Sequence, residues 1–411
     1  MNVLHIVGGE LTGGAARGAY WLHQALLALG VDSRVLTTSE ETYGDGAVIS
    51  VTASKKGKLL HLLRRQVDYA FQYLYPSRKR LIFSTGMIGY DFTRTDGYKQ
   101  ADIVHLHWIC QGMVNVRHLG KISKPVVWTM RDMWPMTGGC HVAEALDCRK
   151  YKTGCGECPQ LQSRHKHDLS HYVLKRKRKY IPAMVRMVGI SRWLSGCARE
   201  SELFKDFDVR TIHNNINTKD FFPVEKAEAR KALGLPADRP IVLAGSINFI
   251  DFYKGFEDYL KAVRGLDPDV LLLFFGKLDP AVVESLEHDY VNLGFLHDIE
   301  SLRLAYSAAD VFVAPSHMDA FGKTLAESMA CGTPVVCYDA TGPKDIVDHR
   351  ENGYRASAFD PEDLARGIKW VLYEADQKML SERARNKAQT CFDSKVIARK
   401  YIALYESMLG D

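Results

Sequence analysis

Residues 319–327 combine acidic, basic and small side chains at a spacing that suits a ligand with hydroxyl and phosphate groups. They follow a buried apolar run, so the first of them should lie in a loop at the carboxyl end of a strand, where α/β sheets bind ligands. Glu327 would fall in the first turns of the next helix and could accept hydrogen bonds from a diol such as ribose. For Glu327 alone, the alternative is a carboxylate that complements the helix dipole. The candidate ligand contacts here are Asp319, Ala320, Phe321, Gly322, Lys323 and Glu327.

A second candidate contact is Lys254, which precedes Gly255 at the start of a helical pattern. Gly245 and Ser246 end the preceding apolar run. A lysine beside a helix N-terminus suits a pyrophosphate group. A lone lysine is usually a solvated surface charge, but the glycine and the position at a strand end favour a functional site.

Glycines follow the first apolar run as Gly8-Gly9 and Gly13-Gly14. Glycines there let backbone N–H groups approach an anion at a helix N-terminus. Their spacing differs from the dinucleotide GxGxxG fingerprint, which disfavours NAD. The alternative is a plain turn between strand and helix.

Four cysteines within nineteen positions could form a structural zinc site that fixes a long insertion. The alternatives are reduced, packed cysteines or oxidised pairs. The candidate ligands are Cys140, Cys148, Cys155 and Cys158. The other five cysteines are expected in the core.

Short apolar runs alternate with helical patterns along the whole chain, which predicts parallel sheets with helices on both faces. The length of 411 residues favours two doubly wound α/β domains over one wide sheet. Asn, Pro and aromatic residues interrupt the pattern near residues 213–223. We therefore expect one domain over residues 1–217 and a second over 218–393. A C-terminal amphipathic helix, residues 394–411, could pack back on either domain.

The composition is that of a globular protein, with 46% hydrophobic and 25% charged residues. Nine cysteines are too few for a disulfide scaffold and point to a reducing compartment. No targeting segment or membrane-spanning run is apparent, so a cytoplasmic protein is expected.

The formal net charge of +5 hides an uneven distribution. Residues 1–217 contain 31 basic and 18 acidic side chains, whereas residues 218–411 contain 23 and 31. The small total gives no support to a nucleic-acid binder. Residues 55–80 interleave basic, leucine and aromatic side chains, and residues 175–179 read KRKRK. Both stretches could dock on an anionic membrane, or could be ordinary solvated helix faces.

The chain resembles the retaining glycosyltransferases of family 4. Asp319 through Val336 is similar to their E-x7-E segment, Lys254-Gly255 to their EKG phosphate lysine, and Gly13-Gly14 to their first glycine loop. Residues 105–108 (HLHW) and 131–141 (RDMWPMTGGCH) resemble the branch that builds bacterial surface polysaccharides, such as colanic acid, exopolysaccharide and O-antigen.

This resemblance implies a GT-B fold, with two Rossmann-like domains facing across a cleft and the C-terminal helix crossing back to the first. It implies that Glu327 holds the ribose hydroxyls, Lys254 the diphosphate, and the loop from Asp319 to Lys323 the transferred sugar. Gly13 and Gly14 would close over the donor from the first domain.

The chain departs from the family pattern at three positions. Asp319 replaces the usual Glu, and Arg131-Asp132 replaces a frequent His-Asp. Ser246 or Asn248 stands at the place of the usual phosphate arginine, and Ser246 is taken as a candidate contact to the donor phosphate. Arg131 could supply charge but cannot act as a base near pH 7. His107 and His141 are the spare candidates for that role.

We therefore expect a glycosyltransferase that moves a hexose from a nucleotide-sugar to a glycan or polyprenyl-diphosphate-linked acceptor, with retention. Asp319, Lys254 and Arg131 are the candidate catalytic residues. No metal cofactor and no covalent nucleophile are expected, because the main demand is stabilising the departing diphosphate. The alternatives are an epimerase or phosphorylase on this fold, or a non-catalytic sugar-nucleotide-binding protein. Localisation at the inner face of the cytoplasmic membrane is expected.

Overall fold

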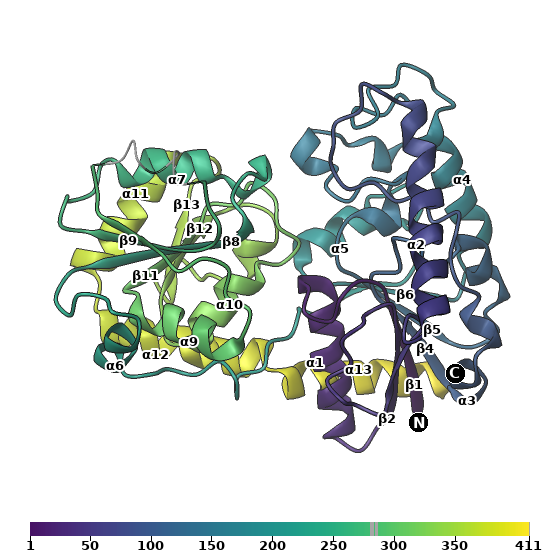
Figure 1. Cartoon of the computed structure of the whole chain (residues 1–411), viewed down its shortest axis with the longest axis horizontal. Helices are drawn as coiled ribbons and strands as arrows, with labels where there is room; N and C mark the ends of the chain where they lie inside the picture. The colour runs from purple at the N-terminus through teal and green to yellow at the C-terminus, as the bar shows by residue number, and fades with distance from the viewer. Residues whose placement is uncertain (280–282, 284–286, 411) are drawn as a thin grey trace. The chain divides into compact units, whose positions relative to one another are not determined.

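The computed structural model describes residues 1–279, 283 and 287–410 (Figure 1). By internal contacts the chain divides into two units. Unit 1 comprises Met1–His213 and Ile397–Asp411, and unit 2 comprises Asn214–Val396. The division thus falls after His213 and Val396, where the sequence analysis expected it after residues 217 and 393. Asp411, the last residue of the expected C-terminal helix, lies outside the described residues.

Unit 1 contains a seven-stranded sheet in the order β3-β2-β1-β4-β5-β6-β7, and its described strand pairs are all parallel. Its strands are β1 Asn2–Val7, β2 Asp32–Thr37, β3 Val48–Ser50, β4 Ile103–Leu106, β5 Val126–Met130, β6 Arg186–Gly189 and β7 Val209–Thr211. Its α-helices are α1 Gly14–Leu27, α2 Lys55–Ala70, α3 Asp96–Gln100, α4 Leu169–Tyr180, α5 Arg192–Arg199 and, from Ile397 on, α13 Ser394–Leu409. The order reverses between β1 and β4, which is where open α/β sheets hold ligands at the strands' carboxyl ends.

Unit 2 contains a six-stranded sheet in the order β10-β9-β8-β11-β12-β13, also with parallel pairs. Its strands are β8 Ile241–Asn248, β9 Leu271–Lys277, β10 Tyr290–Asn292, β11 Val311–Ala314, β12 Val335–Tyr338 and β13 Gly353–Ala356. Its α-helices are α6 Lys226–Ala232, α7 Phe256–Val263, α9 Ile299–Ala308, α10 Lys323–Ala330, α11 Pro361–Lys369 and α12 Gln377–Lys387. Figure 1 shows α7 and α11 on one face of this sheet and α9 and α10 on the other.

Local sequence explains where several helices begin. Asp298 accepts a hydrogen bond from the amide of Ser301 at the start of α9 (2.7 Å), and Asp360 accepts two amide bonds at the start of α11. Such N-caps satisfy amide groups that the helix itself cannot pair. The expected class, α/β with two parallel-sheet Rossmann-like domains, is confirmed.

Helix α13 completes the core of unit 1. Its side chains Ile397, Tyr401 and Leu404 are buried in a cluster with Val3 of β1 and Leu22 of α1. Unit 1 is therefore built from the two ends of the sequence, and the helix is a core element rather than an appendage.

None of the described helices combines the length and the apolar character that crossing a bilayer requires.

Candidate functional site

In unit 2, two strand-end loops bring Lys254 and Asp319 together. Lys254 follows β8 and Asp319 follows β11, and these strands are neighbours in the sheet. The Nζ atom of Lys254 lies 2.8 Å from Oδ2 of Asp319, and the side chains are 29% and 26% exposed. The sequence placed both residues in the site, and the structure adds that they form an ion pair.

The pair is held by backbone groups as well. Oδ1 of Asp319 accepts hydrogen bonds from the amides of Phe321 (3.2 Å) and Gly322 (3.0 Å). Burial alone would raise the pKa of Asp319, but Lys254 and these amides hold it below its usual range. Burial would likewise lower the pKa of Lys254, but Asp319 raises it. Both groups are therefore charged near neutral pH.

Gly255 explains how the lysine loop can lie so close to β11. Its φ is +70°, and a Cβ at this position would stand 1.9 Å from the carbonyl oxygen of Pro315. Any other residue would be strained and would push the Lys254 loop away from the strand end. The amide of His317 donates to the carbonyl of Tyr253 (2.9 Å), which ties the two loops together.

Glu327 lies inside unit 2, on α10, and is only 2% exposed. Its Oε2 accepts a hydrogen bond from the hydroxyl of Tyr306 (3.1 Å), and its Oε1 lies 3.4 Å from Nζ of Lys323. Lys323, expected in the sugar loop, thus contacts the carboxylate expected to hold ribose. Tyr306, on α9, was missed by the sequence analysis, because nothing local marks it as a partner of a residue 21 positions away.

Ser246 lies in the bulged end of β8, where its hydroxyl donates to the carbonyl of Asn248 (3.1 Å). Gly245 packs against the ring of Phe275, and a Cβ there would come within 1.9 Å of it. The predicted phosphate contact of Ser246 is not tested by this geometry.

In unit 1, Gly13 and Gly14 form the start of α1. The amide of Gly13 donates to the carbonyl of Glu10 (2.8 Å), and no side chain caps the helix or places an acidic group in its first turn. The helix N-terminus therefore keeps its positive character, as anion binding requires. A Cβ on Gly14 would meet nothing within 4 Å, so space for a ligand group is open there.

Arg131 is buried in unit 1, just beyond β5. Its side chain is turned inward, with Nη2 3.2 Å from Nδ1 of His107, and burial lowers its pKa to about 10. The residue is charged at neutral pH. Its candidate catalytic role, which would need contact with substrate, stays a prediction.

The neighbouring Asp132 organises the strand ends instead. Its Oδ2 accepts hydrogen bonds from Nε1 of Trp108 (2.8 Å) and Nδ1 of His141 (2.6 Å). His141 Nε2 lies 3.0 Å from the hydroxyl of Ser84. The hydrogen bonds link a serine, a histidine and an aspartate in the order found in a hydrolase triad. Ser84, however, is only 1% exposed, so a substrate could not reach its hydroxyl. This array positions loops rather than attacking a substrate.

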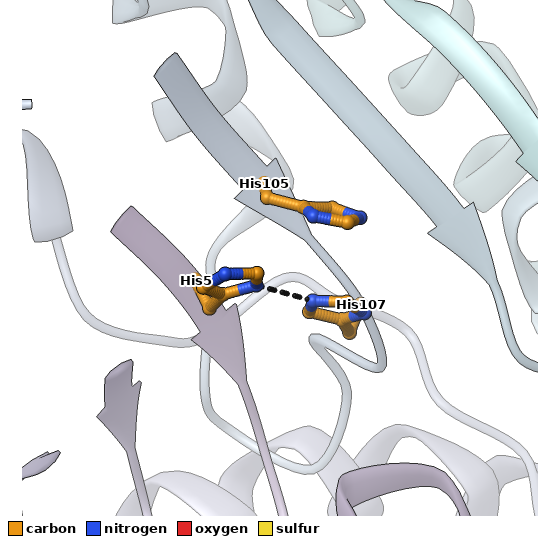
Figure 2. Close-up of side chains that lie close together, drawn as sticks. All are labelled: His5, His105 and His107. Atoms are coloured by element: carbon orange, nitrogen blue, oxygen red, sulfur yellow. Dashed lines mark hydrogen bonds between the residues drawn. The ribbon is translucent and has the colours of Figure 1, made fainter. Parts of the chain in front are cut away.

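The residues His5, His105 and His107 form a buried cluster in the core of unit 1 (Figure 2). One ring nitrogen of each lies within 4.8 Å of the others, and the described residues include no other such group of three or more possible metal ligands. His5 and His105 are register partners on β1 and β4.

Hydrogen bonding in this cluster argues against a metal. Nδ1 of His107 faces Arg131, which can only donate, so the proton of His107 must be on Nε2. That Nε2 lies 2.9 Å from Nδ1 of His5 and donates to it. The lone pair that a metal would need on Nε2 is therefore absent, and burial lowers the pKa of all three rings well below the usual value. The three rings are therefore neutral: His5 and His107 are hydrogen-bonded to each other, and His105 bonds to Tyr405 and Thr129.

The four cysteines predicted as zinc ligands are free thiols. Burial raises the pKa of Cys140 well above its usual value, and the neighbouring Cys155, Cys158 and Cys148 add to the shift. The amide of Gly138 donates to Sγ of Cys155 (3.1 Å). Ligands of one zinc ion lie closer together than 4.8 Å, and within the described part of the chain no three of these sulfurs do so. The zinc site stays a prediction.

Next to the cysteines, the basic stretch 175–179 is not a uniform surface patch. Lys177 is fully buried on α4 and donates hydrogen bonds to the carbonyls of Trp134 and Thr137. Its Nζ lies 3.5 Å from the centroid of a Trp134 ring, and burial lowers its pKa to about 7. One of the five charges assigned to a possible membrane surface is therefore a core residue.

Taken together, the parallel sheets, the switch point of each and the paired charges at the strand ends of unit 2 define a GT-B-type α/β protein. Residues 225–389 match the family model described as glycosyl transferases group 1. This segment contains Lys254, Asp319 and Glu327, so the chain carries its candidate donor site in a domain of the group 1 glycosyltransferases.

Two named proteins are similar to the chain in sequence. It is 23% identical over 422 residues to the putative colanic acid biosynthesis glycosyl transferase WcaC of Escherichia coli K12, over 99% of this chain and 100% of that one. It is 30% identical over 207 residues to the N,N'-diacetylbacillosaminyl-diphospho-undecaprenol alpha-1,3-N-acetylgalactosaminyltransferase of Campylobacter jejuni, over 47% of this chain and 53% of that one.

A solved structure supports the fold. Sucrose-phosphate synthase from Thermosynechococcus elongatus superposes with a TM-score of 0.70 at 22% identity, over 100% of both chains. The expected GT-B fold is confirmed, and the group 1 glycosyltransferase match covers residues 225–389. Membership of family 4 and retention of configuration stay predictions.

Proposed function

We propose that the chain transfers a hexose from a nucleotide-sugar donor, with retention at the anomeric carbon, to a glycan or polyprenyl-diphosphate-linked acceptor in surface polysaccharide assembly. The observation that carries the proposal is the Lys254–Asp319 ion pair between neighbouring strand ends, in the unit that also holds the buried carboxylate of Glu327. The colanic acid relative and the relative named for a diphospho-undecaprenol substrate support the acceptor class.

The pair can supply the two contacts that a sugar diphosphate needs. When the donor binds, Lys254 exchanges Asp319 for the diphosphate, and Asp319 accepts a hydrogen bond from the sugar. The bond between C1 and the phosphate oxygen breaks, a bond from C1 to the acceptor oxygen forms, and the acceptor proton passes to the departing phosphate. Lys254 stabilises the charge that develops on that phosphate.

Acceptor-dependent transfer separates this proposal from its alternatives. An epimerase would convert the donor without an acceptor, a phosphorylase would need inorganic phosphate, and a binding protein would release no nucleotide. The relatives named above are transferases, which favours transfer over these alternatives.

A thermal-shift panel of UDP-, GDP- and dTDP-sugars tests the donor site. We expect one class to stabilise the wild type and to stabilise Glu327→Gln much less. Because Glu327 is buried, the unliganded variant must first show a cooperative transition. A wild type that no nucleotide-sugar stabilises, or a variant that responds equally, contradicts the assignment.

We also propose that unit 1 contacts the inner face of the cytoplasmic membrane, since its sequence carries the excess of basic residues. Zinc at Cys140, Cys148, Cys155 and Cys158 is a separate structural proposal. Metal analysis of the purified protein should give one equivalent, and a value near zero rules it out.

A further inference from the structure

His317 lies in the loop after β11, two residues before Asp319, and contacts the turn that carries Lys254. Its amide donates a hydrogen bond to the carbonyl of Tyr253 (2.9 Å). Its ring lies against the glycine that follows the lysine, since a Cβ on Gly255 would stand 3.2 Å from Cδ2 of His317. The residues on both sides of Lys254 in the sequence therefore touch His317.

The imidazole of His317 also joins this loop to helix α7. Its Nε2 lies 2.7 Å from Oδ2 of Asp258, which stands in the first turn of α7 and is 8% exposed. The same oxygen accepts a hydrogen bond from the hydroxyl of Tyr338 on β12 (3.1 Å). An ionised carboxylate can only accept, so the proton lies on Nε2 of His317, which donates the hydrogen bond. Because α7 begins at Phe256, directly after the lysine turn, this bond fixes the helix that continues the turn.

A strained phenylalanine packs against the imidazole. Phe359, three residues after β13, has a φ of +62°, a left-handed backbone that is sterically unfavourable for a bulky side chain. The centroid of its ring lies 4.8 Å from that of His317 and 5.8 Å from that of Tyr338. Strained backbone persists where surrounding contacts hold it, and it clusters at functional sites. The rings of Phe359 and Tyr338 therefore confine the His317 side chain beside Asp258.

These contacts matter most when the donor is bound. In the structure, Lys254 is also held by its ion pair with Asp319 (2.8 Å). The proposed function requires Lys254 to exchange Asp319 for the diphosphate, so the ion pair cannot hold the lysine during transfer. The bonds from His317 to Tyr253 and Asp258 use neither side chain of that pair, so they remain available when it opens.

We propose that His317, anchored by Asp258, is a positioning residue that holds Lys254 against the donor diphosphate. The inference rests on the proposed function in one respect, namely that Lys254 contacts a diphosphate. A cation that is already held in place has less conformational freedom to lose on binding, so it increases the affinity for the phosphates. His317 acts through Lys254 and needs no contact with the donor.

Calorimetric titration of the full chain with nucleotides tests this role. The probes are UDP and UMP, GDP and GMP, and dTDP and dTMP, and the pair whose base is bound gives the affinity ratio of diphosphate to monophosphate. His317→Phe keeps an aromatic ring beside Phe359 but loses the bond to Asp258, and should lower this ratio about three- to tenfold. Asp258→Ala breaks the same bond from the other side and should lower the ratio by a similar factor. Thermal unfolding shows that each variant is folded.

A conservative variant and a double variant separate positioning from a general structural role. In His317→Gln the side-chain amide can still donate to Asp258, so the ratio should stay within about twofold of the wild type. In a Lys254→Ala background, His317→Phe should change the ratio by less than about twofold, because the lysine through which it acts is absent. His349, an exposed histidine of the same unit, provides the matched control His349→Phe, which should change nothing.

Three results overturn the inference while the proposed function stands. The first is a ratio that Lys254→Ala lowers but His317→Phe leaves unchanged. The second is an equal loss from His317→Phe with and without Lys254, since the histidine would then act independently of the lysine. The third is a ratio in His317→Gln as low as that in His317→Phe. If Lys254→Ala itself leaves the ratio unchanged, the diphosphate contact is wrong, and the proposed donor site falls together with this inference.

Discussion

In unit 2 the charged groups of the candidate site lie in loops at the strand ends, where Lys254 and Asp319 are each about a quarter exposed. In unit 1 two basic side chains are buried instead. Arg131 is hydrogen-bonded to His107, and Lys177 donates hydrogen bonds to backbone carbonyls. The first arrangement leaves charge accessible to a ligand, whereas the second uses it to organise a core. The accessible pair of unit 2 can therefore contact a ligand directly, whereas these two cations of unit 1 bond to the protein itself.

The largest expected effect is a loss of folding stability in unit 1 when the pH is lowered. The pKa values of His5, His105 and His107 are lowered by burial, so below about pH 6.5 the unfolded chain binds protons that the folded chain does not. The free energy of unfolding of unit 1 therefore decreases as the pH falls below that value. For these three histidines the decrease is up to about 4 kcal/mol per pH unit. Urea unfolding at pH 7.5, 6.5 and 5.5 measures the loss.

Tryptophan fluorescence can report this unfolding for unit 1 alone. Trp370 is the one tryptophan of unit 2 among the six in the chain, so Trp370→Phe leaves the signal to unit 1. His105→Gln should reduce the pH slope by less than a third, because burial also lowers the pKa values of His23 and His61 in the same unit. A urea midpoint that does not move between pH 7.5 and 5.5 contradicts the neutral cluster.

Lys254→Ala should give the next largest effect, confined to the accessible site. Loss of the cation facing the departing diphosphate should lower kcat/KM by about 100- to 1000-fold, or about 3–4 kcal/mol. Lys231→Ala, on the exposed surface of the same unit, should leave the rate unchanged. Steady-state nucleotide release gives both values, and equal rates in the two variants would contradict the role of Lys254.

The loop that carries the lysine can be tested through its glycine. Gly255→Ala introduces a Cβ into a position with φ +70° and 1.9 Å from Pro315 O, and should cost about 3 kcal/mol of unfolding free energy. Gly234→Ala has a similar φ of +66° but open space, and should cost about 1 kcal/mol. Circular-dichroism urea titrations compare the two, and equal losses would show that the contact with Pro315 is unimportant.

The smallest expected effect concerns the hydroxyl of Tyr306, which donates a hydrogen bond to Glu327. Tyr306→Phe removes the 3.1 Å hydrogen bond and should cost about 1 kcal/mol of stability and a few-fold of donor affinity. Tyr259→Phe is the matched control, because the buried hydroxyl of Tyr259 has no hydrogen-bond partner in the described structure. Equal losses of stability in the two variants would contradict a role for the Tyr306 hydroxyl in holding Glu327.

Much of the donor site could be predicted because it is local in sequence. Residues 319–327 follow a strand and open a helix, and Lys254 has the same setting, so strand-end placement follows from a few neighbouring residues. The apolar runs that precede Lys254 and Asp319 form β8 and β11. Short or polar strands such as β3 and β10 were not predicted, because three residues carry too little pattern.

The contacts of unit 1 could not be predicted in the same way. His105 meets Tyr405, 300 positions away, and the burial of Lys177 depends on a loop more than 30 residues earlier. The basic and leucine pattern of residues 55–80 indicated an amphipathic helix but not which face would turn inward. The inward face is set by contacts of Asp68 with Thr85 and of Arg64 with the ring of Tyr90.

The return of α13 to unit 1 affects how the chain is made. Tyr401 is hydrogen-bonded to Thr129, and Tyr405 to His105. Unit 1, whose sheet is synthesised first, therefore lacks a core element until α13 has been synthesised. Unit 2 is contiguous and can fold as soon as Val396 has left the ribosome. The usual N-terminal-first order of folding on the ribosome is thereby inverted, because unit 1 stays incomplete until α13 has been synthesised.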